Sequence, residues 1–154
     1  MKITILAVGK LKERYWREAT EEYLRRLSAF AKVTVLEVPD RDKEETGERV
    51  QKREAADLLK RLPDGAYVVG LDSGGRQLSS EGLAGRIEEL ALHGRSHICF
   101  IIGGSTGLAP EVLTRADELL SFGLQTWPHN LARVMLTEQL YRAFTITAGH
   151  PYHK

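Results

Sequence analysis

The sequence predicts an α/β protein with a mostly parallel sheet flanked by helices, and three observations support this fold class. Short apolar runs rich in β-branched residues alternate with longer segments of helical periodicity, in the order βαβαβαβαβα. Two of these runs, residues 66–71 and 97–102, are nearly continuous, as in strands buried on both faces of a parallel sheet. Glycine-containing turns directly follow several runs, where such a sheet usually binds its ligand.

The predicted strands lie at residues 2–8, 32–38, 66–71, 97–102 and 119–122. Pro39 ends the second strand, because proline cannot donate a hydrogen bond to a neighbouring strand. After the third, the sequence Asp-Ser-Gly-Gly at residues 72–75 is expected to turn the chain.

The predicted helices lie at residues 13–30, 50–62, 80–92, 110–118 and 130–146. In the first, apolar side chains from Tyr15 to Phe30 recur at steps of three and four, which leaves a charged outer face. Pro63 and Gly65 end the second helix. The charged residues 40–48 before it are expected to be a loop or the frayed start of that helix.

Composition indicates an ordinary folded protein, with 42% hydrophobic and 28% charged residues among 154. We expect one domain over residues 1–154. No apolar run approaches the roughly 20 residues that span a bilayer, and the single cysteine, Cys99, cannot form an internal disulfide. A cytoplasmic location without a membrane partner is therefore expected. The net charge of +1 means that any RNA-binding role must depend on a local basic patch.

Three glycine-bearing loops predict a shared ligand pocket at one edge of the sheet. They are residues 71–75, 103–107 and 122–127, and each follows a predicted strand. Neither the phosphate-binding loop G-x-x-x-x-G-K-[ST] nor the dinucleotide fingerprint G-x-G-x-x-G is present. Gly104 and Gly107 match the short G-x-x-G pattern of KH RNA-binding loops, so an RNA-binding module is one alternative.

Polar side chains of the last helix and the chain end are further candidates. Glu138 and Arg142, four residues apart, form either an exposed ion pair or a polar stripe that faces a substrate, with Arg133 about a turn before. The chain ends in His-Pro-Tyr-His-Lys at residues 150–154. No cysteine or carboxylate cluster accompanies His150 and His153, so we expect no metal site.

Several motifs taken together carry a family resemblance. They are Phe-Ile-Ile-Gly-Gly-Ser-Thr-Gly-Leu at 100–108, Leu-Leu-Ser-Phe at 119–122, Trp-Pro-His at 127–129, Arg-Val-Met-Leu-Thr-Glu-Gln-Leu-Tyr-Arg-Ala-Phe at 133–144, and the chain end. In this combination the chain resembles the bacterial RlmH family, which methylates N3 of a pseudouridine in 23S rRNA and belongs to the SPOUT class of methyltransferases.

The resemblance implies a SPOUT fold whose C-terminal part forms a trefoil knot, and a homodimer with the last helix at the interface. It implies that S-adenosylmethionine, the methyl donor, binds to Leu71, Gly103, Gly104, Phe122, Gly123, Leu124, Gln125, Thr126 and Trp127. The implied substrate is a pseudouridine in helix 69 of 23S rRNA, presented by the assembled 70S ribosome.

Our hypothesis for the reaction assigns catalysis to the C-terminal residues. His153 would act as base or substrate orienter, and Arg142 would stabilise an anionic base or a phosphate. Tyr152 would stack on a base, and Glu138 would orient Arg142. Besides the RNA-binding module, a different nucleotide-utilising α/β enzyme is a second alternative, and it predicts a phosphorylated cofactor.

Overall fold

The computed structural model describes residues 1–41 and 47–154, and in that part of the chain five strands form one parallel sheet. The strands are β1 (Lys2–Val8), β2 (Lys32–Val38), β3 (Tyr67–Gln77), β4 (His97–Ile102) and β5 (Glu118–Ser121), in the order β2-β1-β4-β3-β5. The predicted α/β class with a mostly parallel sheet is confirmed. Since all carboxyl ends lie at one edge, the loops that follow the strands meet there.

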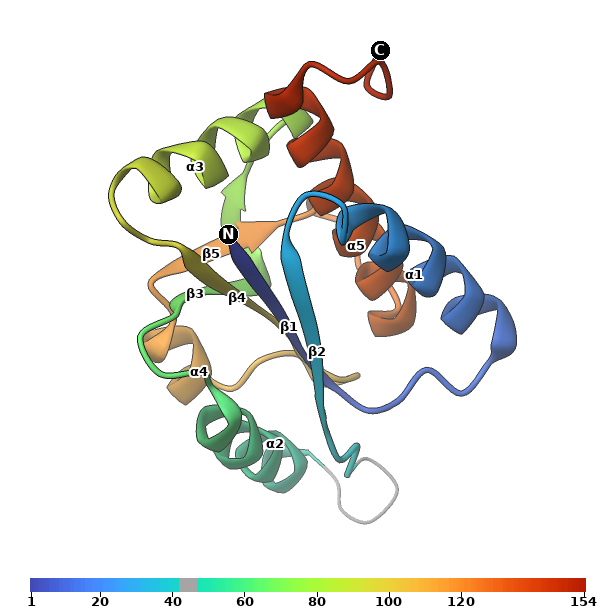
Figure 1. Cartoon of the computed structure of the whole chain (residues 1–154). Helices are drawn as coiled ribbons and strands as arrows, with labels where there is room; N and C mark the ends of the chain where they lie inside the picture. Colours follow the sequence, from blue (N-terminus) through green and yellow to red (C-terminus); the bar gives the residue numbers. More distant parts are fainter. Residues whose placement is uncertain (42–46) are drawn as a thin grey trace.

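Helices cover both faces of this sheet (Figure 1). They are α1 (Arg14–Leu27), α2 (Glu48–Arg61), α3 (Ser80–Leu92), α4 (Pro110–Arg115) and α5 (His129–Ala148). One buried cluster joins α1, α3 and α5 to one face, around Phe100, Leu136 and Leu140. A second joins α2 and α4 to the other face, around Leu58 and Ile101. Strands β1 and β4 are therefore buried from both sides, as their apolar sequences predict.

The helix predictions are confirmed with small shifts at the ends. Helix α4 ends at Arg115 rather than at residue 118. Helix α5 continues to Ala148, where Gly149 adopts a left-handed conformation (φ 72°) that ends the helix. Of the predicted loop at 40–48, residues 42–46 lie outside the described residues, and α2 begins at Glu48. No helix in the described ranges is long and apolar enough to cross a membrane.

Strand β3 departs from the prediction, which ended it at residue 71. The chain does turn at residues 72–75, but it then returns to the same neighbour, so that Leu71 and Arg76 both pair with Leu120 of β5. Gly75 allows this close return, because a Cβ atom there would lie 2.6 Å from the backbone carbon of Leu119. The ending of β3 at Leu71 was therefore wrong, since pairing with a strand some 45 residues away leaves no local pattern.

Cys99 lies fully buried in β4, and burial raises the pKa of its thiol to about 12. At pH 8 only about one thiol in 10⁴ is then ionised, and the thiolate is the reactive form. We therefore expect Cys99 of the folded protein to resist iodoacetamide at pH 8 and to react fully in denaturant. Mass spectrometry over time measures both. Rapid labelling of the folded protein would contradict the burial of β4.

Candidate ligand pocket and C-terminal cluster

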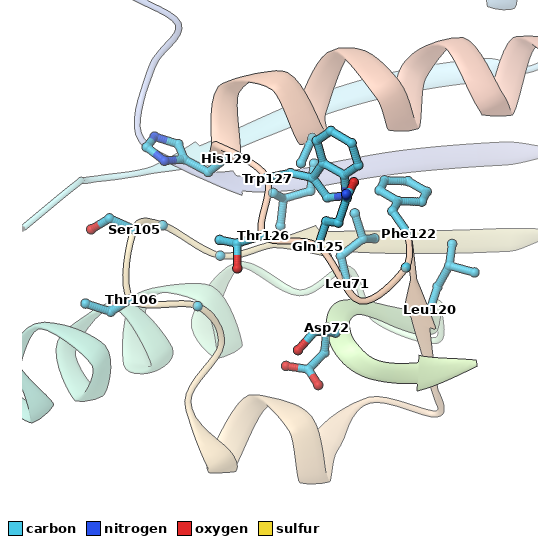
Figure 2. A pocket seen from close by; sticks show the side chains of 17 residues that line it. Leu71, Asp72, Ser105, Thr106, Leu120, Phe122, Gln125, Thr126, Trp127 and His129 are labelled. Carbon is cyan, nitrogen blue, oxygen red and sulfur yellow. The ribbon is translucent and has the colours of Figure 1, made fainter. Parts of the chain in front are cut away.

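A cavity of about 320 Å³ lies where the loops after β3, β4 and β5 meet, and Figure 2 shows the side chains around it. The structure brings together all but one of the residues predicted to bind the donor, namely Leu71, Gly103, Gly104, Phe122, Gly123, Gln125, Thr126 and Trp127. The exception is Leu124, which does not line the cavity and is 89% exposed. The predicted meeting of three glycine-bearing loops is confirmed.

The cavity has further lining residues that were not predicted to bind the donor. They are Asp72, Ser73, Ile102, Ser105, Thr106, Gly107, Leu120, His129 and Ala132. Most belong to the three loops, so their proximity follows from the loop prediction. His129 and Ala132 belong to the first turn of α5 and line the cavity because α5 begins at this edge of the sheet, as Figure 2 shows for His129.

Glycine is required at the turn after β4 because the chain folds back on itself there. A Cβ atom on Gly103 would lie 2.7 Å from the carbonyl carbon of Gly107, closer than any side chain tolerates. Gly107 has a left-handed conformation (φ 74°), and its N–H donates to the Gly104 oxygen at 3.1 Å. The side-chain amide of Gln51 on α2 donates to the Thr106 carbonyl at 2.9 Å. Gln51 thus holds the turn from the side of α2, and residues of the turn line the cavity.

The lining of the cavity is polar and aromatic. Among the residues that the structure describes, neither lysine nor arginine lines the cavity. Asp72 is its carboxylate, and Phe122 and Trp127 are its aromatic side chains. The described lining thus offers a phosphate group an imidazole, His129, but neither lysine nor arginine, whereas Asp72 offers a positively charged ligand a carboxylate partner.

The Arg133 side chain is buried and does not belong to the polar stripe of Glu138 and Arg142. Its buried guanidinium donates to Glu37 Oε2 at 2.6 Å and to the Gly9 carbonyl at 2.8 Å. Because Gly9 follows β1 and Glu37 lies near the end of β2, this one side chain fixes the start of α5 against the carboxyl edge of the sheet.

The four residues assigned to catalysis do lie together, at the other half of α5. Arg142 donates to Glu138 Oε1 at 2.6 and 2.9 Å, and the Tyr152 hydroxyl donates to the same oxygen at 2.9 Å. The guanidinium of Arg142 lies 4.7 Å from the centre of the Tyr152 ring. Glu138 raises the pKa of Arg142, and burial together with the Glu138 hydrogen bond raises the pKa of Tyr152 to about 12. Tyr152 therefore stays protonated near neutral pH.

Both ring nitrogens of His153 are occupied in this cluster. Arg142 Nη1 lies 3.1 Å from Nδ1 and can only donate, so Nδ1 is the acceptor. Nε2 then carries the hydrogen and donates to Glu81 Oε1 on α3 at 2.7 Å. The sequence did not indicate Glu81 as a site residue, because no sequence pattern shows that α3 contacts the chain end. His150 packs edge-on against Phe30 instead, and the described residues hold no group of three or more side chains suited to a metal ion.

The cluster and the cavity lie apart within one chain. Helix α5 is about 28 Å long, and Glu138 lies about 14 Å along it from His129 at the cavity end. A second cavity of about 320 Å³ lies between them and shares Leu120, Phe122 and Gly123 with the first. Its wall includes Gln139, whose amide donates to Glu138 Oε2 at 2.9 Å. None of the four catalytic candidates lines the first cavity.

The parallel sheet and the helices on both of its faces define the protein as an α/β protein, with a glycine-lined cavity at the carboxyl edge of the sheet. The model of the family described as "Predicted SPOUT methyltransferase" matches residues 1–153. The chain belongs to this SPOUT methyltransferase family.

Relatives that resemble the chain over its full length carry a more specific name. Two of them are named ribosomal RNA large subunit methyltransferase H. The protein from Bifidobacterium animalis subsp. lactis is 52% identical to this chain and the protein from Carboxydothermus hydrogenoformans is 50% identical, and each alignment covers 100% of both chains. A solved structure of a probable methylase family protein from Haemophilus influenzae is similar in fold, with a TM-score of 0.54 and 14% identity. That similarity covers 99% of this chain and 70% of the other.

Proposed function

We propose that residues 1–154 form one methyltransferase domain that transfers a methyl group from S-adenosylmethionine to ribosomal RNA. The names of the full-length relatives support the RNA substrate. The finer assignment, N3 of a pseudouridine in helix 69 of 23S rRNA on the assembled 70S ribosome, comes from the family resemblance. With such a substrate the protein would act in the cytoplasm. The trefoil knot that the family implies stays a prediction.

The observation that carries the proposal is the lining of the cavity after β3, β4 and β5. S-adenosylmethionine is a nucleoside with a positively charged sulfonium and no phosphate. The described lining offers Asp72, aromatic side chains and glycine backbone, without lysine or arginine. A volume of about 320 Å³ lies within the range of small-molecule pockets. The residues therefore fit this donor, and they fit the alternative of a phosphorylated cofactor poorly.

The donor supplies, when bound, a methyl group on a sulfur that is already a good leaving group. The protein must therefore align the two reactants and manage the proton on the acceptor nitrogen. The backbone at Gly103, Gly104 and residues 122–127 would hold the nucleoside. Arg142, kept cationic by Glu138, would face the negative charge that develops on the acceptor base. His153 can accept a proton only when Arg142 moves away from Nδ1, so orientation of the substrate is its more direct role.

The distance between cavity and cluster leads to the proposal of a homodimer. Helix α5 buries Leu136 and Leu140 against the sheet, whereas its apolar residues Leu131, Val134 and Met135 are only partly buried. A helix of that kind usually packs against a further surface. In a twofold dimer with antiparallel α5 helices, the chain end of one subunit would lie near the cavity of its partner. Each active site would then combine the donor cavity of one chain with Arg142, Tyr152 and His153 of the other.

A thermal-shift comparison with S-adenosylmethionine, NAD and ATP tests the donor assignment. At a ligand concentration of about 100 times Kd, S-adenosylmethionine should stabilise the protein by about 2.7 kcal/mol. That corresponds to a rise in Tm of about 5–10 °C, with no rise for NAD or ATP. Stabilisation by ATP or NAD alone would favour the nucleotide-utilising enzyme, and no stabilisation would favour the RNA-binding module. Labelled donor with 70S ribosomes, followed by mapping of the modified nucleotide, tests the acceptor.

A further inference from the structure

We infer that the segment Lys10–Arg17, which joins β1 to α1 and forms its first turn, is the RNA-docking surface beside the donor cavity. Lys10 and Lys12 would contact phosphates, and the Tyr15 ring would stack on an unpaired base. The inference rests on the proposed rRNA substrate and names the part of the chain that holds it. Neither the cavity nor the C-terminal cluster includes these residues.

The first reason is charge. Residues 10–17 contain four basic side chains, at positions 10, 12, 14 and 17, against one acidic side chain, Glu13, although the whole chain has a net charge of only +1. Arg14 is paired with Glu18 at 2.6 Å. Lys10 and Lys12 are exposed, and no carboxylate partner for either is found in the described part of the chain. A phosphate backbone is the partner that two such unpaired lysines suit best.

The second reason is that the segment is held in a fixed shape. Leu11 is buried between the two exposed lysines and anchors the segment to the core. Arg17 Nη1 donates to the Lys12 carbonyl at 2.6 Å and lies 3.4 Å from the Leu11 carbonyl. The Arg17 guanidinium therefore binds backbone carbonyls of the segment. The side chains of Lys10 and Lys12 are exposed to solvent on either side of the buried Leu11. A fixed segment loses little conformational entropy on binding.

The third reason is an exposed aromatic ring. Tyr15 is 63% exposed, although its neighbour Trp16 packs against it edge-on with the ring centres 5.1 Å apart. Of the large hydrophobic side chains that are exposed in the described structure, Leu124 and Trp127 also lie at this edge of the sheet. Exposed aromatic rings next to basic side chains are the usual platform for single-stranded RNA.

The fourth reason is position. Ala7 of β1 pairs with Ile102 of β4, so the segment after β1 leaves the sheet beside the glycine turn of the cavity. Val8 lies 3.1 Å from where a Cβ atom of Gly104 would be. Lys10 is two residues further, at most about 7 Å along the chain. Lys10 and Lys12 therefore lie next to a cavity whose described lining contains no lysine or arginine, where they can contact the phosphates around a nucleotide placed there.

The test compares K10A/K12A and Y15A with a control that removes the same charge at the opposite edge. Lys32, at the start of β2, and Lys60, near the end of α2, are exposed there, so K32A/K60A is that control. Methylation of 70S ribosomes is measured from 50 to 200 mM salt. Binding of a single-stranded RNA oligonucleotide is measured by filter retention, and the subunit count by light scattering.

We expect K10A/K12A to raise KM for ribosomes about tenfold with kcat unchanged. The dependence of log KM on log salt should flatten by about 1.4, because each of the two lost phosphate contacts to a single strand removes about 0.7. Y15A should raise KM about tenfold without changing that slope, and Y15F should restore it, because stacking needs the ring and not the hydroxyl. K32A/K60A should behave as wild type, and donor affinity should be the same in all variants.

Each contrary outcome has its own meaning. Methylation by K10A/K12A with wild-type KM and slope would overturn the docking surface and leave the proposed function standing. Weaker binding to ribosomes with undiminished binding to RNA would overturn it in favour of a ribosomal protein. A change in subunit count for Y15A would assign the ring to a subunit contact. Loss of oligonucleotide binding by K10A/K12A, with no methylation by the wild type, would support the surface and reject the proposed reaction.

Discussion

Replacement of Gly103 by alanine is expected to weaken binding of S-adenosylmethionine by about ten- to a hundredfold, since a polar group of the cavity that loses its hydrogen-bond partner costs about 1–3 kcal/mol. The added Cβ atom would lie 2.7 Å from the Gly107 carbonyl carbon and 2.9 Å from its oxygen. Both are backbone atoms, so the turn must open to make room. The groups that line the cavity at Gly104 and Gly107 would move with it. Isothermal titration calorimetry with the donor measures the loss.

The G85A variant is the matched control for this substitution. Gly85 lies inside α3, and nothing is within 4 Å of the position that its Cβ would take. Alanine there should leave donor affinity unchanged and stabilise the protein by up to about 1 kcal/mol, because alanine is the better helix former. Donor binding by G103A with wild-type affinity, in protein that unfolds at the same temperature, would show that the donor binds elsewhere.

Removal of residues 150–154 is expected to lower kcat by about 10²–10⁴-fold, the usual effect of losing a positioned acid or base. The deletion takes away Tyr152 and His153, which contact Glu138 and Arg142, and leaves every residue that lines the donor cavity. Donor affinity should therefore stay measurable. Turnover and donor titration on the same preparation give both quantities. Deletion of the exposed Lys154 alone is the control, and full activity of the five-residue deletion would refute the catalytic assignment.

The same two changes also distinguish a shared active site from a self-contained one. In a shared active site, the chain end of one subunit completes the cavity of the other. Subunits that lack residues 150–154 then still have an intact cavity, and G103A subunits still have an intact chain end. Mixing the two inactive variants should restore about a quarter of wild-type activity, since half of the dimers are mixed and each has one complete site. If no activity returns although mixed dimers form, the chain end acts on its own cavity.

Local signals were sufficient for the elements of the fold. Hydrophobic periodicity and glycine or proline at the element ends predicted the strands and helices to within a few residues, except for the continuation of β3 past residue 71. The meeting of the three glycine loops also followed from the sequence, because loops after parallel strands share one edge. That reasoning could not exclude Leu124, which is exposed while its neighbours in the same loop line the cavity.

The sequence by itself therefore determined the α/β class, the order of the elements and the edge of the sheet at which the three glycine loops meet, because each of these depends on signals within short segments of the chain. Only the tertiary structure decided that Arg133 turns inward to Glu37 and Gly9, and that Glu81 holds His153. It also decided that Glu138 and Arg142 lie half a helix away from the donor cavity. The physical reason is that these contacts join side chains far apart in sequence, and packing of the helices on the sheet selects them.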